Sequence, residues 1–273
     1  MKFTHQLQFF FRSFFLQAGW NYMKFQHIGL TFVMLPFLKR LYRKDKDALP
    51  SVLSRYLETF NTQPIMASFC IGALAKQEEK IAHAPDMKDF NEQVEQWDDL
   101  KQELTITTAS IGDRLFWGTL KPMTLLLALF IWVAMGINFF EVELPAQLPV
   151  WYALTGSAMA FCVFNSVALF VKWKGLQISY NADEKNCFGL TGFDWNKTIF
   201  YARRIAFVLT VAMLVTGLYE FLKEVVLLDV HFVTRALIVI FFICICFITR
   251  RLRIPNMYLY LAAVAVFNIV CYL

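Results

Sequence analysis

The sequence predicts an all-α integral membrane protein with about five transmembrane helices, because apolar residues dominate the chain and gather into long runs. Hydrophobic residues make up 58% of its 273 residues, its mean hydropathy is +0.49, and it contains 29 phenylalanines. That is more apolar surface than a soluble domain of this length buries. Three runs approach the roughly 20 residues that a helix needs to cross the hydrocarbon core: Met123–Phe140, Val150–Val171 and Met257–Leu273.

Four shorter apolar segments complete the predicted membrane region. Two of them, Ile205–Tyr219 and Ala236–Ile248, span the bilayer if flanking residues take part. The other two, Ile28–Leu38 and Ile65–Ala75, have 11 residues each and are too short to span alone. We expect re-entrant hairpins or half-helices there, covered by protein or by a water-filled cavity.

Residues 1–121 are predicted to form an N-terminal region of interfacial, short membrane and polar cytoplasmic helices, and residues 122–273 a transmembrane helical region. The aromatic run Phe9–Leu16 contains Arg12 and fits either an interfacial helix at the headgroups or a helix packed in the protein. The stretch Lys76–Glu103 carries nine acids and four bases around Pro85. It is typical of a solvated helical hairpin, with a docking surface as the alternative.

Charge asymmetry predicts the topology. Residues 141–149 contain two glutamates and no lysine or arginine, whereas residues 172–204, read as the next loop, contain six basic residues. The positive-inside rule then places the first loop outside and the second in the cytoplasm. The N-terminus is therefore predicted to be cytoplasmic and the C-terminus outside, with Arg250, Arg251 and Arg253 as a cytoplasmic anchor.

The cysteines and histidines do not predict catalytic or metal chemistry. Six cysteines fall mostly inside apolar runs, and four histidines are scattered without the spacing of metal ligands or of a nucleophile and its base. We therefore expect no metal, no cofactor and no catalytic residue.

Three polar islands interrupt the apolar sequence: Gln17–Asn21 (QAGWN), Asn61–Pro64 (NTQP) and Gly112–Thr119 (GDRLFWGT). An unpaired polar group in a low-dielectric environment costs roughly 1–3 kcal/mol, so these groups need partners. Each island also contains a glycine or a proline, which predicts a helix break or a close approach of the chain to a neighbour. Membrane transporters build their substrate sites from such features.

The islands belong to an ordered set of motifs: Arg12-Ser13, Gln17-Ala18-Gly19-Trp20-Asn21, Met34-Leu35-Pro36, Lys39-Arg40-Leu41-Tyr42, Phe60-Asn61-Thr62-Gln63-Pro64, Glu78-Glu79, Gly112-Asp113, Phe116-Trp117-Gly118-Thr119, Lys121-Pro122 and Lys172-Trp173-Lys174-Gly175. A basic cluster before Pro255 and a last apolar helix close the set. In order and spacing these motifs resemble the IID membrane component of the mannose/fructose/sorbose-type sugar phosphotransferase system.

The resemblance implies a membrane subunit that works with a IIC subunit in the bacterial inner membrane to carry a hexose-type sugar inward. Cytoplasmic IIA and IIB phosphocarrier proteins would relay phosphate to the sugar, so the subunit itself would be non-catalytic. The implied partners are thus other proteins, the sugar and the lipid bilayer, with no nucleic acid. The alternative is a diverged IID homologue that no longer transports and acts as a membrane scaffold or regulator.

Four residues are candidates for the translocation path. Asn61 and Gln63 carry amides that suit sugar hydroxyls, although helix capping and packing against the IIC subunit explain them as well. Asp113 fits a sugar contact or an ion pair with Arg114. Trp117 fits stacking on a pyranose ring or a place in the interfacial aromatic belt.

Trp20 and Asn21 are candidates for the partner interface.

The chain departs from the family before the Gly112-Asp113 pair. Members of the family resemble G-P-L-A-G there, whereas this chain reads Ile106-Thr107-Thr108-Ala109-Ser110. Glycine gives backbone freedom that threonine lacks, so this loop is expected to be stiffer or to re-form as helix. The loss of the glycine-rich turn favours the scaffold alternative, and the retained NTQP and FWGT motifs favour the transporter.

Overall fold

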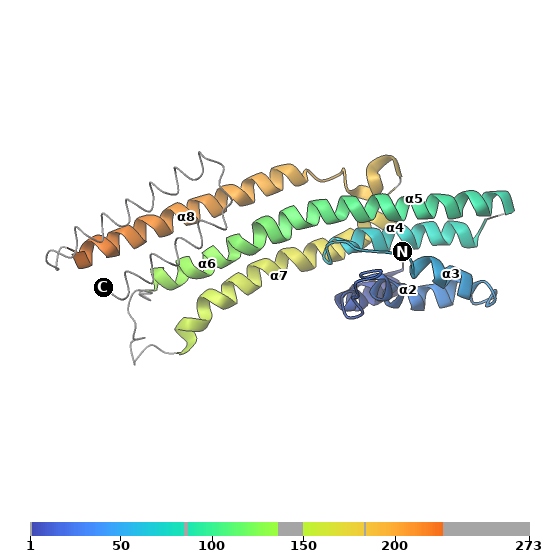
Figure 1. Ribbon diagram of the computed structural model, residues 1–273, viewed down its shortest axis with the longest axis horizontal. Coiled ribbons are helices and arrows are strands. Elements are labelled where there is room, and N and C mark those ends of the chain that lie inside the picture. Colours follow the sequence, from blue (N-terminus) through green and yellow to red (C-terminus); the bar gives the residue numbers. More distant parts are fainter. Residues whose placement is uncertain (1, 85–86, 136–149, 183, 226–273) are drawn as a thin grey trace. The chain divides into compact units, whose positions relative to one another are not determined.

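Every named element in the part of the chain that the structure describes is helical, as the sequence predicts (Figure 1). The computed structural model describes residues 2–84, 87–135, 150–182 and 184–225. Within these ranges, β-structure is limited to two isolated bridges, Asn21 with Phe25 and Phe25 with Phe60. Contacts divide the chain into two compact units, residues 1–213 and 214–273, and nearly all the described helices lie in the first.

The described elements follow in the order α1 (Phe3–Arg12), η1 (Ser13–Phe15), α2 (His27–Leu41), α3 (Leu49–Tyr56), α4 (Ala67–Ala82), α5 (Met87–Gly112), η2 (Asp113–Leu120), α6 (Lys121–Ala134), α7 (Val150–Asn181), η3 (Glu184–Gly189) and α8 (Trp195–Val225). Of these, η1 and η3 are 3-10 turns and η2 is a π-helix. The predicted boundary after residue 121 falls inside the uninterrupted helical run from α5 through η2 to α6, and that division stays a prediction.

Helix α4 is the centre of the first unit. All its residues from Ala67 to Ala75 are buried, and it packs against α2, α5 and α7. Small residues bring α4 and α7 together: a Cβ at Gly72 would lie 2.1 Å from Oγ of Ser179, and one at Gly175 would lie 2.4 Å from Oγ of Ser68. The two helix backbones can approach this closely because neither crossing point carries a large side chain.

The two short apolar segments each form part of a single helix. Ile28–Leu38 lies in α2 and Ile65–Ala75 runs into α4, so neither folds as a hairpin. Protein covers the beginning of α4, where every residue from Ala67 to Ala75 is buried.

The polar stretch Lys76–Glu103 is helical on both sides of residues 85–86, as predicted for a helical hairpin, but it is not solvated throughout, because Glu78 and Lys101 are buried. It comprises the end of α4 and the beginning of α5, and the two helices pack against each other. Residues 106–110, where a loop re-formed as helix is expected, lie inside α5. The threonines therefore continue the helix, where the resemblance implied a glycine-rich turn.

The prediction that residues 172–204 form one loop is wrong. Helix α7 continues past Val171 to Asn181, and α8 begins at Trp195, so only residues 182–194 connect the two helices. Hydropathy falls at Lys172, but its amine is buried, donates to the carbonyl oxygen of Ser13 at 3.2 Å, and lies over the Phe14 ring. Packing on the N-terminal helices thus extends α7 beyond its apolar run.

Helix α1 is packed in the protein along one face, and the position of this aromatic run at the headgroups stays a prediction. Gln6 and Phe9 are buried where α1 packs on α2 and α7, whereas Phe3 and Phe11 are more than 60% exposed. One face is therefore packed in the protein, and the other is free to contact lipid or a partner.

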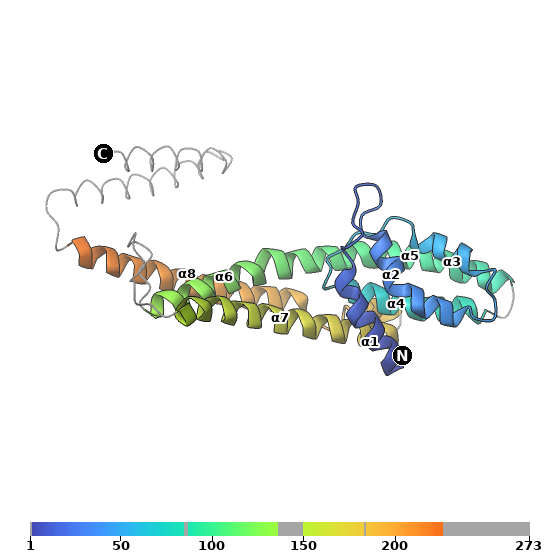
Figure 2. The same ribbon diagram turned by 90° about the horizontal axis from the view of Figure 1, so that it is seen from below.

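Three described helical segments are long and apolar enough to cross a membrane: Lys88–Ala134, Leu154–Asn181 and Trp195–Thr216. In the first two, α6 and α7 run side by side (Figures 1 and 2). The remaining predicted membrane features lie outside the described residues: the 141–149 loop, Ala236–Ile248, the Arg250–Arg253 anchor and Met257–Leu273.

Candidate functional site

Two of the predicted polar islands meet at the end of α5. The loop Asn61–Pro64 leads from α3 to α4, and its Gln63 packs on Gly112, the last residue of α5. A Cβ at Gly112 would lie 2.5 Å from Cβ of Gln63, so the site accepts only glycine without a shift of the neighbouring chain. This is the close approach predicted for the island. We name the contact of loop 61–64 with the end of α5 the NTQP junction.

Thr62 fixes the loop to two other helices. The Gln26 side chain donates to the carbonyl oxygen of Thr62 at 2.8 Å and accepts from its N–H at 3.1 Å. The hydroxyls of Thr62 and Thr108 are 2.7 Å apart, and Sγ of Cys70 lies 3.3 Å from the Thr108 hydroxyl. All four side chains are buried, so these bonds hold the loop in one position. Thr108 belongs to the stretch that replaces the family's glycine-rich turn.

Gln63 stabilises the turn before helix α4 with one end of its amide. Its Oε1 accepts from the N–H groups of Ile65 and Met66 at 2.7 and 2.9 Å, both of which precede the helix. The other end, Nε2, is buried without an acceptor. Such an orphan donor costs roughly 1–3 kcal/mol unless another molecule supplies an acceptor.

Asn61 points away from Gln63. Its side chain is exposed and lines a polar cavity of about 550 Å³ beside α5. The other lining residues are Glu58, Thr59, Asp98, Lys101, Gln102, Thr105 and Ile106. The two amides that the sequence suggested as a pair therefore face different surroundings.

Asp113 and Trp117 lie on the π-helix η2, directly after the NTQP junction. Both side chains are exposed, and Lys121 lies 4.8 Å from the centre of the Trp117 ring. Arg114 donates to Oδ1 of Asn196 at 3.4 Å, so its guanidinium turns toward α8 rather than toward Asp113. A π-helix of eight residues is rare, and such wide turns are frequent at functional sites.

Of the four path candidates, the structure brings only Gln63 into the buried junction. Asn61, Asp113 and Trp117 are exposed around it.

Trp20 and Asn21 occupy an exposed loop before α2. Oδ1 of Asn21 accepts from the N–H groups of Met23 and Lys24 at 3.1 and 3.0 Å, which shapes the loop. Trp20 is 43% exposed and stacks edge-on against Tyr22, and Tyr22 and Met23 are more than 85% exposed. Asn21 thus has a local structural role, whereas the large side chains around it are free.

A buried polar cluster on Glu78 was not anticipated from the sequence. Its carboxylate has no exposed surface and accepts from Arg55 at 2.6 Å, Tyr42 at 2.7 Å and Tyr56 at 3.0 Å. These donors come from α3 and from the end of α2, so Glu78 ties both to α4. Burial raises the pKa of the Glu78 carboxyl, and Arg55 and the two tyrosine hydroxyls oppose the rise.

Helical periodicity offers the signal that would have found this cluster. Glu78 follows Ile71 by seven residues and Leu74 by four, so it shares their buried face. The sequence reading assigned it instead to the solvated polar stretch.

Comparison with known proteins gives a family match over most of the chain. A family model described as the PTS system mannose/fructose/sorbose family IID component matches residues 3–222. The mannose-specific EIID component of Escherichia coli K12 is 30% identical over 172 residues, which is 63% of this chain and 53% of that protein. The sorbose-specific EIID component of Klebsiella pneumoniae is 31% identical over 171 residues, 63% of this chain and 54% of that protein. The chain thus spans about half the length of the curated relatives it matches.

Solved structures give a matching fold. The cryo-EM structure of the mannose transporter ManYZ in complex with microcin E492 superposes with a TM-score of 0.53 and 26% identity, covering 78% of this chain and 70% of that one. A structure described as a membrane protein superposes with a TM-score of 0.55 and 25% identity over the same shares.

Proposed function

Because this chain belongs to the mannose/fructose/sorbose family of phosphotransferase IID components, we propose that it carries a hexose-type sugar inward together with a IIC subunit. Phosphorylation of the sugar would be done by separate IIA and IIB proteins. The membrane location follows from the family and from the apolar helices. The bacterial inner membrane, a cytoplasmic N-terminus and an external C-terminus are parts of the proposal.

The observation that carries the transport role is the orphan donor of Gln63 at the NTQP junction. Its Nε2 is buried and lacks an acceptor within the described chain, although the rest of the junction is hydrogen-bonded. A sugar hydroxyl or a carbonyl of the IIC subunit would supply that acceptor. The junction also stands at the point where α5 passes into η2 and then into the apolar helix α6, so a ligand there would contact a helix that enters the membrane.

Exposed residues around the junction fit the path to it. Asn61 lines the polar cavity beside α5, where amide, hydroxyl and carboxylate groups suit a polyhydroxyl ligand. Asp113 and Trp117 lie on η2 on the other side of the junction. A tryptophan ring and a carboxylate are the groups that stack on a sugar ring and bond its hydroxyls.

The loop around Trp20 is the proposed contact with the IIC subunit. Trp20, Tyr22 and Met23 present large apolar side chains that the first unit leaves uncovered. Aromatic residues and methionine are enriched in the cores of protein interfaces. Replacing Trp20 with alanine should lower the amount of IIC subunit that co-purifies without changing the thermal stability of the chain alone.

A charge substitution at Gln63 separates its acceptor role from its donor role. Gln63→Glu keeps an oxygen that accepts from the N–H groups of Ile65 and Met66, but it removes the amide donor. In cells that produce the partner proteins and lack other hexose permeases, uptake of labelled sugar should fall about twofold to tenfold, since one hydrogen bond is lost. Because Gln63 is buried, the new carboxylate loses its solvation and should lower the thermal midpoint, so uptake is compared at equal protein level.

The matched control is Gln177→Glu, the same substitution at an exposed position of α7. It should leave uptake unchanged. If Gln63→Glu folds normally and transports as well as the control, the Nε2 donor does not serve the sugar.

One observation favours the second candidate, a scaffold or regulator that does not transport. The family's glycine-rich turn is replaced by helix, and Thr108 from that helix bonds to the NTQP loop through Thr62. This bond restrains the junction that a transporter would have to move. Thr108→Ala and Thr62→Ala should then raise uptake if the restraint limits a working transporter, and should leave uptake absent if the chain is a scaffold.

A further inference from the structure

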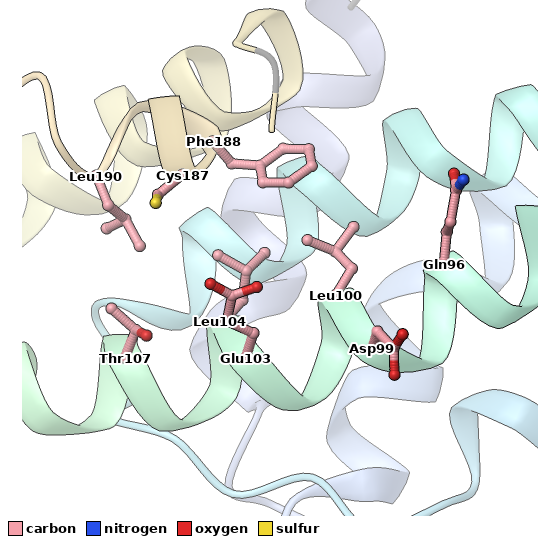
Figure 3. Close-up of a pocket in the computed structure, with 9 residues that line it drawn as sticks. All are labelled: Gln96, Asp99, Leu100, Glu103, Leu104, Thr107, Cys187, Phe188 and Leu190. Carbon is pink, nitrogen blue, oxygen red and sulfur yellow. The ribbon is translucent and has the colours of Figure 1, made fainter. Parts of the chain in front are cut away.

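A second cavity, of about 290 Å³, lies between the outer face of α5 and the turn that follows α7 (Figure 3). Leu100 and Leu104 from α5 and Phe188 and Leu190 from the turn form its apolar lining, and each of them is at most 6% exposed. The cavity is separate from the NTQP junction and from the polar cavity at Asn61, because it has no lining residue in common with either.

The wall of this cavity formed by the turn has a fixed and unusual backbone. Cys187, Phe188 and Gly189 have φ values of +42°, +49° and +81°, so three consecutive residues are in the left-handed region. Two of them carry side chains, which makes this conformation unfavourable in the absence of other contacts. Hydrogen bonds from Trp195 to the carbonyl of Leu190 at 2.8 Å and from the Leu190 N–H to the carbonyl of Cys187 at 3.1 Å hold it. The Phe188 side chain is thereby kept against α5.

The rim of the cavity is acidic. Asp99 and Glu103 line it one helical turn apart on α5, and within the described residues no ion pair joins either of them. Residues 87–103 contain six acids and two bases, and one of the bases, Lys101, is turned inward to the carbonyl oxygen of Arg55. The exposed surface of α5 beside the cavity is therefore negative.

Charge also places this part of α5 in water. A segment with eight ionisable side chains in 17 residues does not enter hydrocarbon, so the apolar part of the long helix that spans the membrane comes later, in α6. The acidic rim would repel anionic lipid headgroups as well. An apolar pocket on an aqueous, negative surface is suited to a protein partner.

We propose that this cavity docks a segment of a partner protein that inserts an apolar side chain between Phe188 and Leu104 and sets lysine or arginine side chains against Asp99 and Glu103. A buried apolar anchor surrounded by complementary charge is the arrangement that gives protein interfaces both affinity and register. The docking site is independent of the transport proposal, since it uses none of the residues of the NTQP junction.

The test uses the full chain in nanodiscs of phosphatidylcholine, and empty nanodiscs of the same lipid measure how much probe binds to the lipid itself. The probe is a fluorescein-labelled amphipathic peptide of leucine and lysine, and its binding is followed by fluorescence anisotropy. We expect saturable binding that weakens with salt, and a peptide of serine and lysine with the same charge should bind at least about tenfold more weakly, because it lacks the apolar anchor.

Paired charge variants locate the binding. The double variant Asp99→Asn, Glu103→Gln should weaken binding of the leucine–lysine peptide about tenfold or more. The control Glu92→Gln, Glu95→Gln removes the same charge from exposed positions of α5 that do not line the cavity, and it should change binding less than about twofold. Equal weakening by both double variants, equal binding of the two peptides, or no saturable binding would each overturn the proposal.

Discussion

Removing the charge of Glu78 should unfold the first unit at a markedly lower temperature. In Glu78→Gln the amide nitrogen faces donors, and the guanidinium of Arg55 loses the carboxylate that it contacts at 2.6 Å. Loss of one partner of a fully buried pair costs about 3–5 kcal/mol, and since Arg55 is 13% exposed we expect the lower end, about 3 kcal/mol. At about 2–4 °C per kcal/mol for a unit of this size, the thermal midpoint should fall by about 6–12 °C.

The assay is thermal unfolding of the purified chain in detergent, followed by tryptophan fluorescence. Trp97 is a suitable reporter because it is buried against Tyr56, which itself donates to Glu78. The control Lys80→Ala replaces an exposed residue two positions further along α4 and should change the midpoint by no more than about 1–2 °C. A Glu78→Gln midpoint within that same margin would refute the reasoning that the cluster ties α2 and α3 to α4.

The pH dependence gives an independent check on Glu78. Burial raises its pKa above the ordinary 4.5, so the folded state binds this proton more tightly than the unfolded state. The associated stability is complete below pH 4.5 and is lost as the pH rises through the raised pKa. The Gln variant has no such proton, so the difference in unfolding free energy between parent and variant should shrink as the pH rises through this window. A difference that grows instead would mean that pairing with Arg55 outweighs burial.

Two further predictions concern close packing and topology. Gly112→Ala places a Cβ 2.5 Å from Cβ of Gln63 and should destabilise the chain by about 1–3 kcal/mol. In Gly118→Ala the new Cβ meets nothing closer than 3.4 Å, so this variant should be neutral or stabilising. Thermal unfolding of both variants checks this, and equal midpoints would show that the neighbouring chain shifts to accept the Cβ at residue 112. In a variant that keeps Cys187 as its only cysteine, this exposed residue of the 182–194 connection should react with an impermeant maleimide only after cells are permeabilised, and labelling of intact cells would invert the proposed topology.

The sequence was sufficient for the class of the protein, and it indicated that the polar islands are places of close approach. Long apolar runs predicted membrane helices, and polar islands with glycines predicted close approaches, which Gly112 makes on Gln63. The loss of glycines at residues 106–110 predicted helix there, and α5 runs through that stretch. These features depend on local composition, which a single sequence displays directly.

The end of α7 could not be predicted from local composition. Hydropathy falls at Lys172, yet the helix continues because Gly175 and Ser179 pack on α4 and Lys172 bonds to Ser13. These contacts join residues more than 100 positions apart, and the sequence of α7 alone does not indicate them.

The site shows the same limit. Asn61 and Gln63 are two residues apart and chemically alike, but Asn61 is exposed in a cavity, whereas Gln63 is buried and bonds to the turn before α4. In the sequence, Glu78 resembles the other acids of a solvated stretch. In the fold, it accepts hydrogen bonds from Tyr42 and Arg55, which lie elsewhere in the chain. Burial of a polar side chain is decided by tertiary contacts, and residue type alone does not reveal it.

The most direct test of the transport role is sugar uptake by cells that contain a IIC partner and the IIA and IIB proteins, with and without this chain. The account predicts that labelled hexose enters and accumulates as its phosphate only when the chain is present and co-purifies with the IIC partner. Uptake that is the same without the chain, or a chain that assembles with the IIC partner and supports no uptake of any hexose offered, would contradict the transport role and leave the scaffold as the function of this IID homologue.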